Sequence, residues 1–258
     1  MPLSKRQAQI TEMMCQTDFR RVEDLANLFQ VTTQTIRRDL NILTDLGIVR
    51  RVHGGVQRMN TAGNLVYAWR QILNLDAKQI IAHKVAQHVP NDVSIAFSIG
   101  ATPEMVSKAL LRHTNLRIFT NNLNIAHMAC TNTTFEITVA GGRLRNQDRD
   151  IMGSGMESLF GSYKVDIGIY GVAGVDKDGT LLDFYEEEVR ARQIIRENSS
   201  SSYLVLDHSK FGRAEHVRGG RIEDATKIFC DRTPPVAILQ IIRRSSSQLI
   251  LCSEEETS

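Results

Sequence analysis

Apolar residues in the first part of the chain recur at helical spacing in three short runs. Within each run they stand three, four or seven positions apart, the spacing that lines one face of a helix. The runs are Ile10, Met13 and Met14; Val22, Leu25, Ala26 and Phe29; and Ile36, Leu40, Leu43 and Leu46. We therefore predict three amphipathic helices. Thr32 is the predicted N-cap of the third helix and Gly47 its terminating residue, because a Thr hydroxyl accepts from a free backbone N–H and Gly readily adopts a positive φ.

The segment that follows, residues 48–58, places β-branched residues on both sides of Gly54-Gly55. This pattern predicts a short β-hairpin with its turn at the two glycines. Two helices, a tight connection at residues 30–32, a third helix and a hairpin follow one another in the order of a winged helix-turn-helix. We expect residues 1–58 to form such a DNA-binding domain.

A different rhythm begins at residue 76, where helical and strand-like runs alternate. Predicted helices cover residues 77–88, 103–111, 123–130, 154–160, 184–198 and 236–243. Predicted strands cover residues 93–99, 116–120, 135–140, 166–172, 203–206, 227–230 and 248–251. Such alternation favours an α/β fold with a mostly parallel sheet and helices on both faces. We interpret residues 59–75 as a linker, 199–202 as a polar loop, 253–258 as an acidic tail, and 76–258 as a second domain.

The composition narrows the class of protein. With 258 residues, 42% hydrophobic and 23% charged, the chain resembles globular proteins and can bury one large core or two modest ones. No apolar run approaches the roughly 18–20 residues that cross a bilayer, and residues 1–20 lack the apolar core of a secretory signal. The cysteines (Cys15, Cys130, Cys230 and Cys252) form no C-x-x-C pair, which indicates scattered thiols. We expect a cytoplasmic protein with no membrane partner.

The charge is unevenly distributed. Residues 1–58 carry nine Lys or Arg against six Asp or Glu, a net charge of +3, whereas the remaining residues carry 22 against 23. A basic domain joined to a nearly neutral one is typical of a protein whose first domain binds a polyanion. A randomly uneven surface is the alternative that the count alone leaves open.

The outer face of the third predicted helix carries groups that recognise DNA. The first turn of a recognition helix approaches the bases, where amide, hydroxyl and guanidinium groups read base edges. We expect base contacts from Thr33, Gln34, Thr35 and Arg37, and phosphate contacts from Arg38, Arg50, Arg51 and His53, with the hairpin as the wing. A solvated helix face is the alternative for Arg37-Arg38; the tight turn and the Arg50-Arg51 pair favour DNA.

Small and polar residues gather after the predicted strands. In parallel α/β sheets, ligands bind outside the carboxyl ends of the strands, where helix N-termini offer free N–H groups to anions. The predicted effector-binding residues are Gly100, Ala101, Thr102, Asn121, Arg143, Asp176, Glu188 and Lys210. Glycines, a hydroxyl and two cations suit a phosphate, and the amide and carboxylates suit hydroxyl groups. One such loop is an ordinary connector, but five at one sheet edge favour a site for a small phosphorylated polyol or sugar.

Several motifs resemble one family. Residues 34–40 (Gln-Thr-Ile-Arg-Arg-Asp-Leu), Leu46-Gly47 and residues 51–55 (Arg-Val-His-Gly-Gly) resemble the DNA-binding head of the DeoR family of bacterial transcriptional repressors. Residues 99–104, 120–124, 140–142 and 207–213 are similar to the effector domain of that family, whose fold resembles ribose-5-phosphate isomerase. The resemblance spans residues 5–252.

This resemblance implies a function. The expected protein is a repressor of a carbohydrate or glycerol 3-phosphate catabolic regulon. It binds double-stranded operator DNA as a homo-oligomer, a dimer or a tetramer, and a small phosphorylated effector releases it. The implied effector is sn-glycerol 3-phosphate or a related phosphosugar.

Three positions depart from the family pattern. Arg21 stands where relatives often carry a Ser or Thr cap before the second helix, and the lost capping bond costs about 0.5–2 kcal/mol. Ser98 stands where relatives usually carry Asp, and Ala101 where they carry a hydroxyl residue. Losing a carboxylate and a hydroxyl beside the predicted phosphate loop would weaken or retune effector binding.

The isomerase-like fold raises one alternative, a sugar-phosphate isomerase with a regulatory DNA-binding head. That reaction needs a carboxylate base, but Asp176 is followed by Lys177-Asp178, without the Asp-Glu pair of those isomerases. The histidines His83, His88, His113 and His127 lack the spacing of metal ligands. We expect no catalytic residue, metal or cofactor; a repressor of the same family for another phosphosugar is the second alternative.

Overall fold

The computed structural model describes residues 3–17, 19–45, 47–58, 67–146 and 148–253. The chain divides into two compact units, residues 1–75 and 76–258, called here the head and the sensor unit. Of the predicted features, Leu46, residues 59–66 of the linker and residues 254–258 of the tail lie outside the described residues. Within the expected linker the chain forms helix α4 (Tyr67–Ile72). No helix in the described ranges is long and apolar enough to cross a membrane.

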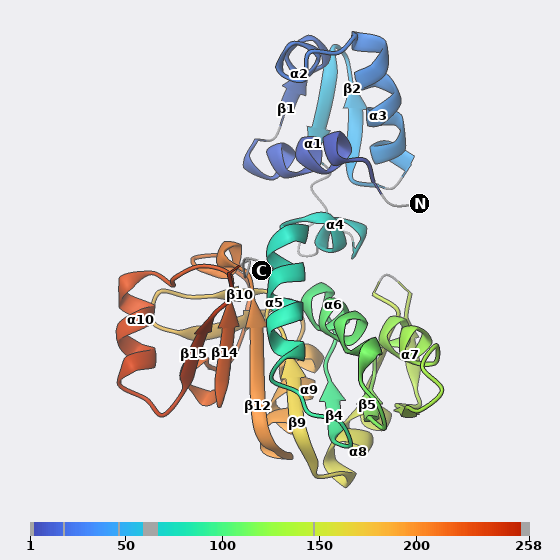
Figure 1. Cartoon of the computed structure of the whole chain (residues 1–258). Coiled ribbons are helices and arrows are strands. Elements are labelled where there is room, and N and C mark those ends of the chain that lie inside the picture. The colour runs from blue at the N-terminus through green and yellow to red at the C-terminus, as the bar shows by residue number, and fades with distance from the viewer. Residues whose placement is uncertain (1–2, 18, 46, 59–66, 147, 254–258) are drawn as a thin grey trace, which may run out of the picture. The chain divides into compact units, whose positions relative to one another are not determined.

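The head is a winged helix-turn-helix, as predicted (Figure 1). Helices α1 (Lys5–Gln16), α2 (Val22–Leu28) and α3 (Thr33–Asp45) match the three apolar runs. Strands β1 (Phe19–Arg21), β2 (Val49–Val52) and β3 (Gly55–Arg58) form an antiparallel sheet in the order β1-β3-β2. The apolar faces meet in one core, in which Ile10, Met14, Ile36, Leu40 and Leu43 are fully buried.

Both ends of α3 follow the predicted chemistry. Thr32 Oγ1 accepts a hydrogen bond from the backbone N–H of Thr35 at 3.2 Å, so Thr32 caps the helix. Gly47 has a φ of 68°, and the N–H of Ile48 donates to the carbonyl of Leu43 at 2.8 Å, the bond that closes a helix at a glycine. Arg21 makes no side-chain capping bond at the start of α2, as expected.

The hairpin turn differs by one residue from the prediction. His53 and Gly54 form it, with Gly54 at a φ of 75°, whereas Gly55 opens β3 and pairs with Val52. Gly55 meets a different requirement, because a Cβ there would lie 2.3 Å from the carbonyl oxygen of Arg20 in β1. The sequence did not predict β1, since three residues are too few to show a strand period.

The sensor unit is built on a seven-stranded sheet in the order β15-β14-β12-β9-β4-β5-β6, and all its neighbours are parallel, as predicted. The strands are β4 (Ser94–Phe97), β5 (Arg117–Thr120), β6 (Glu136–Val139), β9 (Val165–Tyr170), β12 (Ser199–Leu206), β14 (Lys227–Cys230) and β15 (Gln248–Leu251). The chain runs outward from β4 through β5 and β6, then returns to β9 on the other side of β4. The boundary between β4 and β9 is therefore the topological switch point of the sheet.

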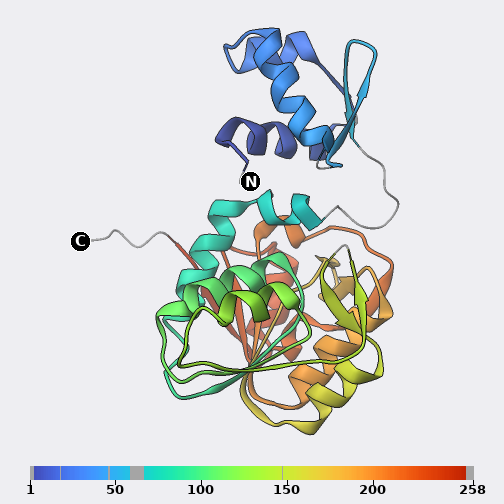
Figure 2. The same ribbon diagram turned by 90° about the vertical axis from the view of Figure 1, so that its right-hand side faces the viewer.

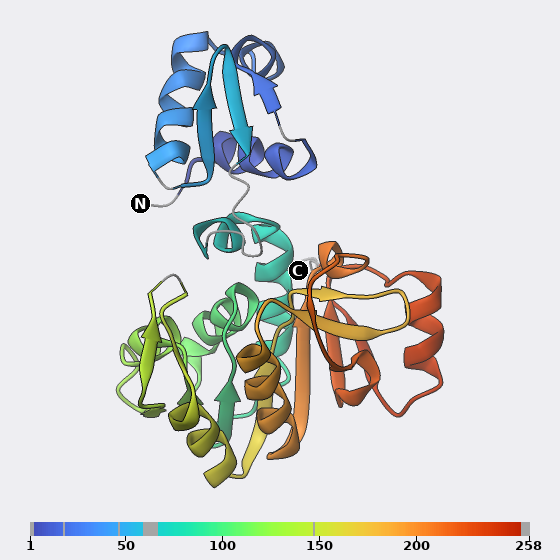
Figure 3. The ribbon, with the colours of Figure 1, turned by 180° about the vertical axis from the view of Figure 1, so that it is seen from behind.

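Helices cover both faces of this sheet, with a core under each layer. On one face lie α5 (Leu75–Ala86), α6 (Ala101–Ala109) and α7 (Leu123–Ala129). On the other, seen in Figure 3, lie α8 (Ser154–Ser162), α9 (Glu186–Glu197) and α10 (Val236–Arg243). Figure 2 shows the two layers on either side of the sheet. Short 3-10 turns follow α6 at Leu110–Arg112 and β12 at His208–Lys210, and a third covers Ile222–Asp224.

Two small antiparallel sheets follow the carboxyl ends of the strands of the main sheet. They are the hairpin β7 (Arg143–Arg145) and β8 (Asp150–Met152), and the three-stranded sheet of β10 (Gly174–Val175), β11 (Thr180–Asp183) and β13 (Val217–Arg221). The prediction of a polar loop at residues 199–202 is wrong, because these serines open β12 and pair with β9. The two strands pack closely at this point, since a Cβ on Gly168 of β9 would lie 2.3 Å from Ser199 Oγ.

Candidate functional site

The exposed face of α3 is polar and positively charged. Gln34, Arg37 and Arg38 are exposed there, and Thr33 and Thr35 are half-buried in the first turn. The Thr35 hydroxyl lies 3.0 Å from that of the capping Thr32, so it already takes part in the N-terminal cap. The structure thus places Gln34 and Arg37 on the exposed face of α3, with the half-buried Thr33 and Thr35 at its borders.

The wing carries two further exposed guanidinium groups, one of which contacts α3. Arg50 and Arg51 on β2 are exposed, as is His53 in the turn. Arg50 donates from Nε and Nη2 to Gln57 Oε1 at 3.1 and 2.8 Å, and Arg51 Nη1 donates to Asn41 Oδ1 of α3 at 2.8 Å. Because a guanidinium has five N–H donors, both side chains are held in place with donors left for phosphate oxygens.

A buried acid fixes the orientation of α3. Asp39 is 5% exposed and accepts hydrogen bonds from Arg6 Nε at 2.5 Å and Gln7 Nε2 at 2.8 Å, both on α1. The pair ties the inner side of α3 to α1, which leaves the face with Arg37 and Arg38 directed outward.

In the sensor unit, the loops after β4 and β9 meet at the switch point. Gly100, the N-cap residue of α6, has a φ of 131° and, as a glycine, supplies no side-chain capping bond to the first N–H groups of this helix. A Cβ on Gly100 would lie 3.2 Å from Pro103 Cδ, and one on Gly171, after β9, 3.4 Å from the same atom. The first turn of α6, with Ala101 and Thr102, therefore packs closely on the β9 loop at the switch point.

Asn121, at the end of β5, adds an unsatisfied acceptor to this edge. Its side chain is 1% exposed, and its Nδ2 donates to the carbonyl of Ile151 at 3.0 Å. Its Oδ1 is buried and has no hydrogen-bond partner in the described part of the chain. The next residue, Asn122, caps α7 and donates to Glu104 Oε1 of α6 at 2.7 Å. A buried carboxylate thus links the loops that follow β4 and β5.

The loop after β12 places a carboxylate near two lysines. Asp207 is 1% exposed and accepts from the N–H of Ser209 at 3.0 Å. Burial raises the pKa of Asp207, but the charges of Lys210 and Lys78 and the hydrogen bonds from Ser209 outweigh burial and hold that pKa below its usual range. Lys210 is half-buried, whereas Lys78 of α5 is only 3% exposed. Since β12 lies two strands from β4, this group is about 10 Å along the edge from Gly100.

Glu188, a predicted ligand for effector hydroxyls, belongs to a cluster around Arg145. Arg145 Nη2 lies 2.7 Å from Glu188 Oε1, 2.9 Å from Asp150 Oδ2 and 3.3 Å from Asp148 Oδ2. The other oxygen of Glu188 accepts from the N–H of Phe184 at 3.3 Å. Burial lowers the pKa of Arg145, but the surrounding carboxylates outweigh it and raise that pKa above its usual value. Both Glu188 oxygens are therefore already engaged: Oε1 joins α9 to the β7–β8 hairpin through Arg145, and Oε2 binds the backbone just before α9.

Two other predicted ligands lie apart from the switch point. Arg143 is exposed at the start of β7. Asp176 is exposed in the turn between β10 and β11, a hairpin that reaches toward α10 in Figure 3. That turn is anchored by the N–H of Ile222, which donates to the carbonyl of Gly179 at 2.8 Å. We predicted Asp176 in the loop directly after the strand at residues 166–172. Strand β10, which lies between that strand and Asp176, has only two residues and leaves no recognisable pattern in the sequence.

Sequence reasoning missed three charged residues at this edge, Lys78, Asp207 and Arg145. Lys78 had a signal, since it stands three, four and seven positions before Ile81, Ala82 and Val85, on the apolar stripe of α5. Asp207 lies in the recognised motif at residues 207–213, but only Lys210 of that motif was predicted to bind the effector. Arg145 had none, because its partners Asp150 and Glu188 come from separate elements.

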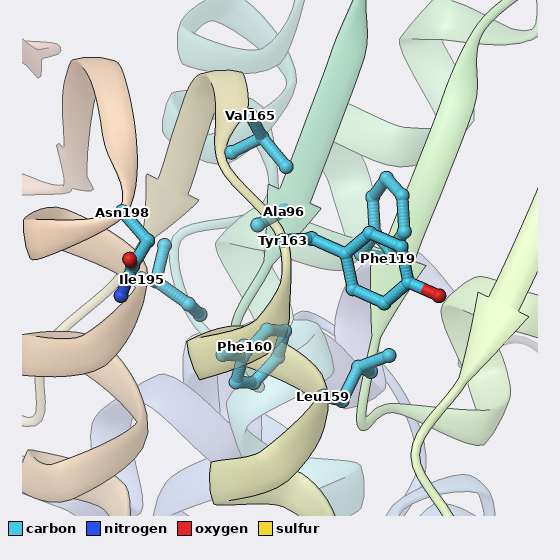
Figure 4. Close-up of a pocket in the computed structure, with 8 residues that line it drawn as sticks. All are labelled: Ala96, Phe119, Leu159, Phe160, Tyr163, Val165, Ile195 and Asn198. Carbon is cyan, nitrogen blue, oxygen red and sulfur yellow. The ribbon is translucent and has the colours of Figure 1, made fainter.

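A depression lies on the α8 side of the sheet, apart from the residues described above (Figure 4). It is lined by Ala96, Phe119, Leu159, Phe160, Tyr163, Val165, Ile195 and Asn198, and the rings of Phe119 and Tyr163 are 4.5 Å apart. Its lining is apolar except for the Tyr163 hydroxyl and Asn198, with no charged side chain. It also lies toward the amino ends of the strands, since Val165 opens β9. It does not suit a phosphate.

A winged helix-turn-helix with a cationic exposed face, joined to a parallel α/β unit whose loops meet at a topological switch point, is typical of a ligand-sensing transcriptional regulator. Comparison with known families identifies which one. Residues 6–62 match the DeoR-like helix-turn-helix domain and residues 73–232 match the DeoR C terminal sensor domain. The chain belongs to the DeoR family.

Relatives of known name cover almost the whole chain. The glycerol-3-phosphate regulon repressors of Escherichia coli K12 and Haemophilus influenzae are each 40% identical to it, over 98% of this chain and 100% and 98% of theirs. The HTH-type transcriptional repressor CsqR of Escherichia coli K12 is 32% identical over 97% of this chain and 96% of its own. All three are transcriptional repressors, in agreement with the prediction that this chain is a regulator and not an enzyme.

Similarity to solved structures is more distant. Ribose 5-phosphate isomerase A of Methanocaldococcus jannaschii aligns with a TM-score of 0.40 and 16% identity over 54% of this chain and 55% of that chain. The δ subunit of eIF2B from Chaetomium thermophilum aligns with a TM-score of 0.47 and 10% identity over 62% and 61%.

Proposed function

We propose that this protein represses genes for the use of glycerol 3-phosphate and leaves its operator when the sensor unit binds sn-glycerol 3-phosphate. One observation carries the proposal. The uncapped N-terminus of α6 stands at the switch point, with the buried Asn121 on one side and Lys210 on the other. The two relatives that are 40% identical are named as repressors of the glycerol-3-phosphate regulon.

The chemistry of the effector follows from the order of these groups along the edge. The phosphate binds at the first N–H groups of α6, beside Gly100 and Thr102, because a helix N-terminus favours an anion. Lys210 neutralises part of its charge. The remaining hydroxyl groups extend toward Asn121, whose buried Oδ1 accepts from a hydroxyl donor. A three-carbon phosphate ester is long enough to reach from the first turn of α6, after β4, to Asn121, after the neighbouring strand β5, because adjacent strands lie about 5 Å apart.

The operator is recognised by paired heads. The sensor units associate as a dimer or tetramer, so that two α3 helices enter successive major grooves about 34 Å apart on a two-fold symmetric site. The effector favours an arrangement of the sensor units that separates the heads from this spacing. By linkage, operator DNA weakens effector binding by the same factor.

An effector titration of the protein–operator complex tests the proposal. Fluorescence anisotropy with a labelled promoter fragment should show operator affinity fall by about 10–100-fold as sn-glycerol 3-phosphate is added. Glycerol and inorganic phosphate serve as controls for the two halves of the molecule. Release by a different phosphate ester would show that the repressor responds to another phosphosugar. An operator affinity that stays the same with every phosphate ester would refute the proposed function.

A paired substitution tests the ligand assignment. Lys210→Ala should bind operator as the wild type does but resist release, because the effector phosphate loses its cation. Lys164→Ala, which removes an exposed lysine before β9, is the matched control and should respond normally. Unchanged release of Lys210→Ala would exclude Lys210 from the site.

A further inference from the structure

The proposed effector site leaves one buried charge unexplained. Lys78 lies in the first turn of α5 and is 3% exposed. The residues that follow it on the same face, Ile81, Ala82 and Val85, belong to the apolar core between α5 and the sheet. An ammonium group without a counter-ion is strongly disfavoured in such a position, so Lys78 requires an acid at the same level of the fold.

Contacts at the other end of α5 identify that level. Tyr203 Oη, in β12, donates to the carbonyl of His88, just past the end of α5, at 3.2 Å. The His88 ring also meets the ring of Phe229 in β14 edge-on, with centroids 5.2 Å apart. From His88 back to Lys78 the helix rises about 15 Å. From Tyr203 forward to Asp207 the strand spans about 13 Å.

Because α5 runs opposite to β12 (Figure 1), these two lengths bring Lys78 level with Asp207. Asp207 is the acid that the lysine requires, since it is 1% exposed at the carboxyl end of β12. The pKa of Asp207 agrees with this arrangement: burial raises it, but Lys210, Lys78 and the Ser209 hydrogen bonds together lower it below its usual range.

The sequence position of Lys78 gives the pair its significance. Residue 75 ends the head and begins α5, so Lys78 lies three residues after the boundary between the two units. Asp207 lies three residues before Lys210 in the loop after β12. One carboxylate thus interacts with a cation of the effector loop and with a cation of the segment that leads from the head.

We propose that the Lys78–Asp207 pair couples effector binding to operator release. The inference rests on the proposed function, since it needs an anionic effector at the loop that carries Lys210. An anion that engages Lys210 changes the charge balance at Asp207. Lys78 responds to that change and transmits it to the first turn of α5, from which the chain leads to the head. Lys78 acts as a positioning residue and does not contact the effector, because the half-buried Lys210 is the accessible cation of the two.

The test separates effector binding from its consequence. Effector affinity is measured without DNA by isothermal titration calorimetry with sn-glycerol 3-phosphate. Operator affinity is measured by anisotropy with and without saturating effector, and the ratio of the two operator affinities is the coupling factor. For Lys78→Met we expect both separate affinities to stay within about threefold of wild type, while the coupling factor falls from about 10–100 to below about 3.

Matched variants control for the loss of a lysine from α5. Lys84→Met removes a half-buried lysine two turns further along the same helix and should keep the wild-type coupling factor. Lys78→Arg retains the positive charge and should keep most of the coupling. Lys78→Gln, which is neutral but polar, decides the question if Lys78→Met fails to fold, and circular dichroism melting shows which variants are folded.

Two results would overturn the inference. A coupling factor unchanged in the folded neutral variants would show that Lys78 does not transmit the effector signal. A loss of effector affinity of about tenfold or more would make Lys78 a ligand instead of a positioning residue. Failure of the proposed function is distinguishable from both, because the wild-type protein would then bind no sn-glycerol 3-phosphate or would keep its operator affinity in its presence.

Discussion

At the scale of single residues, the guanidinium groups of the head differ in how they are held. Arg37 is exposed on the outer face of α3, where no acid is paired with it in the described structure. Arg51, on the wing, is bound to Asn41 Oδ1 at 2.8 Å. A side chain that projects from the recognition helix can adapt to base edges, whereas one tied to the protein presents its remaining donors to the backbone of any duplex.

This difference predicts distinct substitution effects. Arg37→Ala should cost about 1–3 kcal/mol on the operator and relax base choice, while Arg51→Ala should weaken operator and scrambled duplexes alike and reduce the salt slope by about 1. Anisotropy titrations on both duplexes at several salt concentrations measure these terms. Arg244→Ala, which removes an exposed arginine of the sensor unit, is the control. Equal losses of specificity for the two head variants would contradict the division of roles.

At the scale of elements, α3 depends on one polar anchor as well as on its apolar face. Asp39 is tied to Arg6 and Gln7 of α1, and the Arg6 side chain is 32% exposed while that of Asp39 is 7% exposed. Water can therefore solvate Arg6 if the carboxylate is lost, but the amide of Gln7 stays largely buried, at 7% exposure. The anchor fixes both the stability of the head and the direction in which the recognition face points.

We expect Asp39→Ala to lower the free energy of unfolding of the head by about 1–3 kcal/mol, because a buried amide donor loses its acceptor. Urea denaturation of the whole protein, followed by far-UV circular dichroism, measures the change. Asp45→Ala, at the exposed end of the same helix, should change stability by less than about 0.5 kcal/mol. A loss as small for Asp39→Ala would show that the anchor contributes little.

The elements also show where sequence patterns suffice. The long periodic runs of α3, α5 and α10 are visible in the sequence because their burial repeats with the helical period. The serines that open β12 gave the opposite signal, since strand formation there is imposed by pairing with β9. Strands of two or three residues, such as β1, β7 and β10, are too short to carry a period of their own.

At the scale of the whole molecule, the sensor unit should lose stability in acid through Asp207. Its pKa in the folded protein is below the usual value of 3.8, because Lys210, Lys78 and Ser209 outweigh the effect of burial. A carboxyl group with a lowered pKa stabilises the fold above the pKa of the unfolded chain. That contribution disappears as the pH falls through the lower, folded value.

The expected measurement is a difference between wild type and Asp207→Asn. Wild type should be more stable in urea at pH 7, and the gap should narrow below about pH 4 as Asp207 is protonated. Asp166→Asn serves as the reference for general acid effects. Hydrogen bonds from Ser94 lower the pKa of the Asp166 carboxyl, which lies far from the effector loop. A gap that is constant from pH 7 to the acid limit would show that the ionised form of Asp207 is not stabilised by folding.

The sequence by itself determined the elements and the order in which they are assembled. The helices and the hairpin of the head could be predicted, because the hydrophobic period, the capping residues and the turn glycines act over a few neighbouring positions. The parallel sheet could also be predicted, because strands that alternate with helices have few other ways to bury both faces. The positions of Gly100, Thr102 and Asn121 at the edge of the sheet were predictable for the same reason, since these residues come soon after predicted strands.

Only the tertiary structure decided which charges meet. Glu188 faces Arg145, Asp39 is bound by Arg6, and Asp207 shares the positive charges of Lys210 and Lys78. Glu188 and Arg145 are 43 positions apart, Asp39 and Arg6 33, and Asp207 and Lys78 129, and no local period records such separations. Burial makes these interactions strong, because a charge removed from water must find its partner wherever the chain topology brings one.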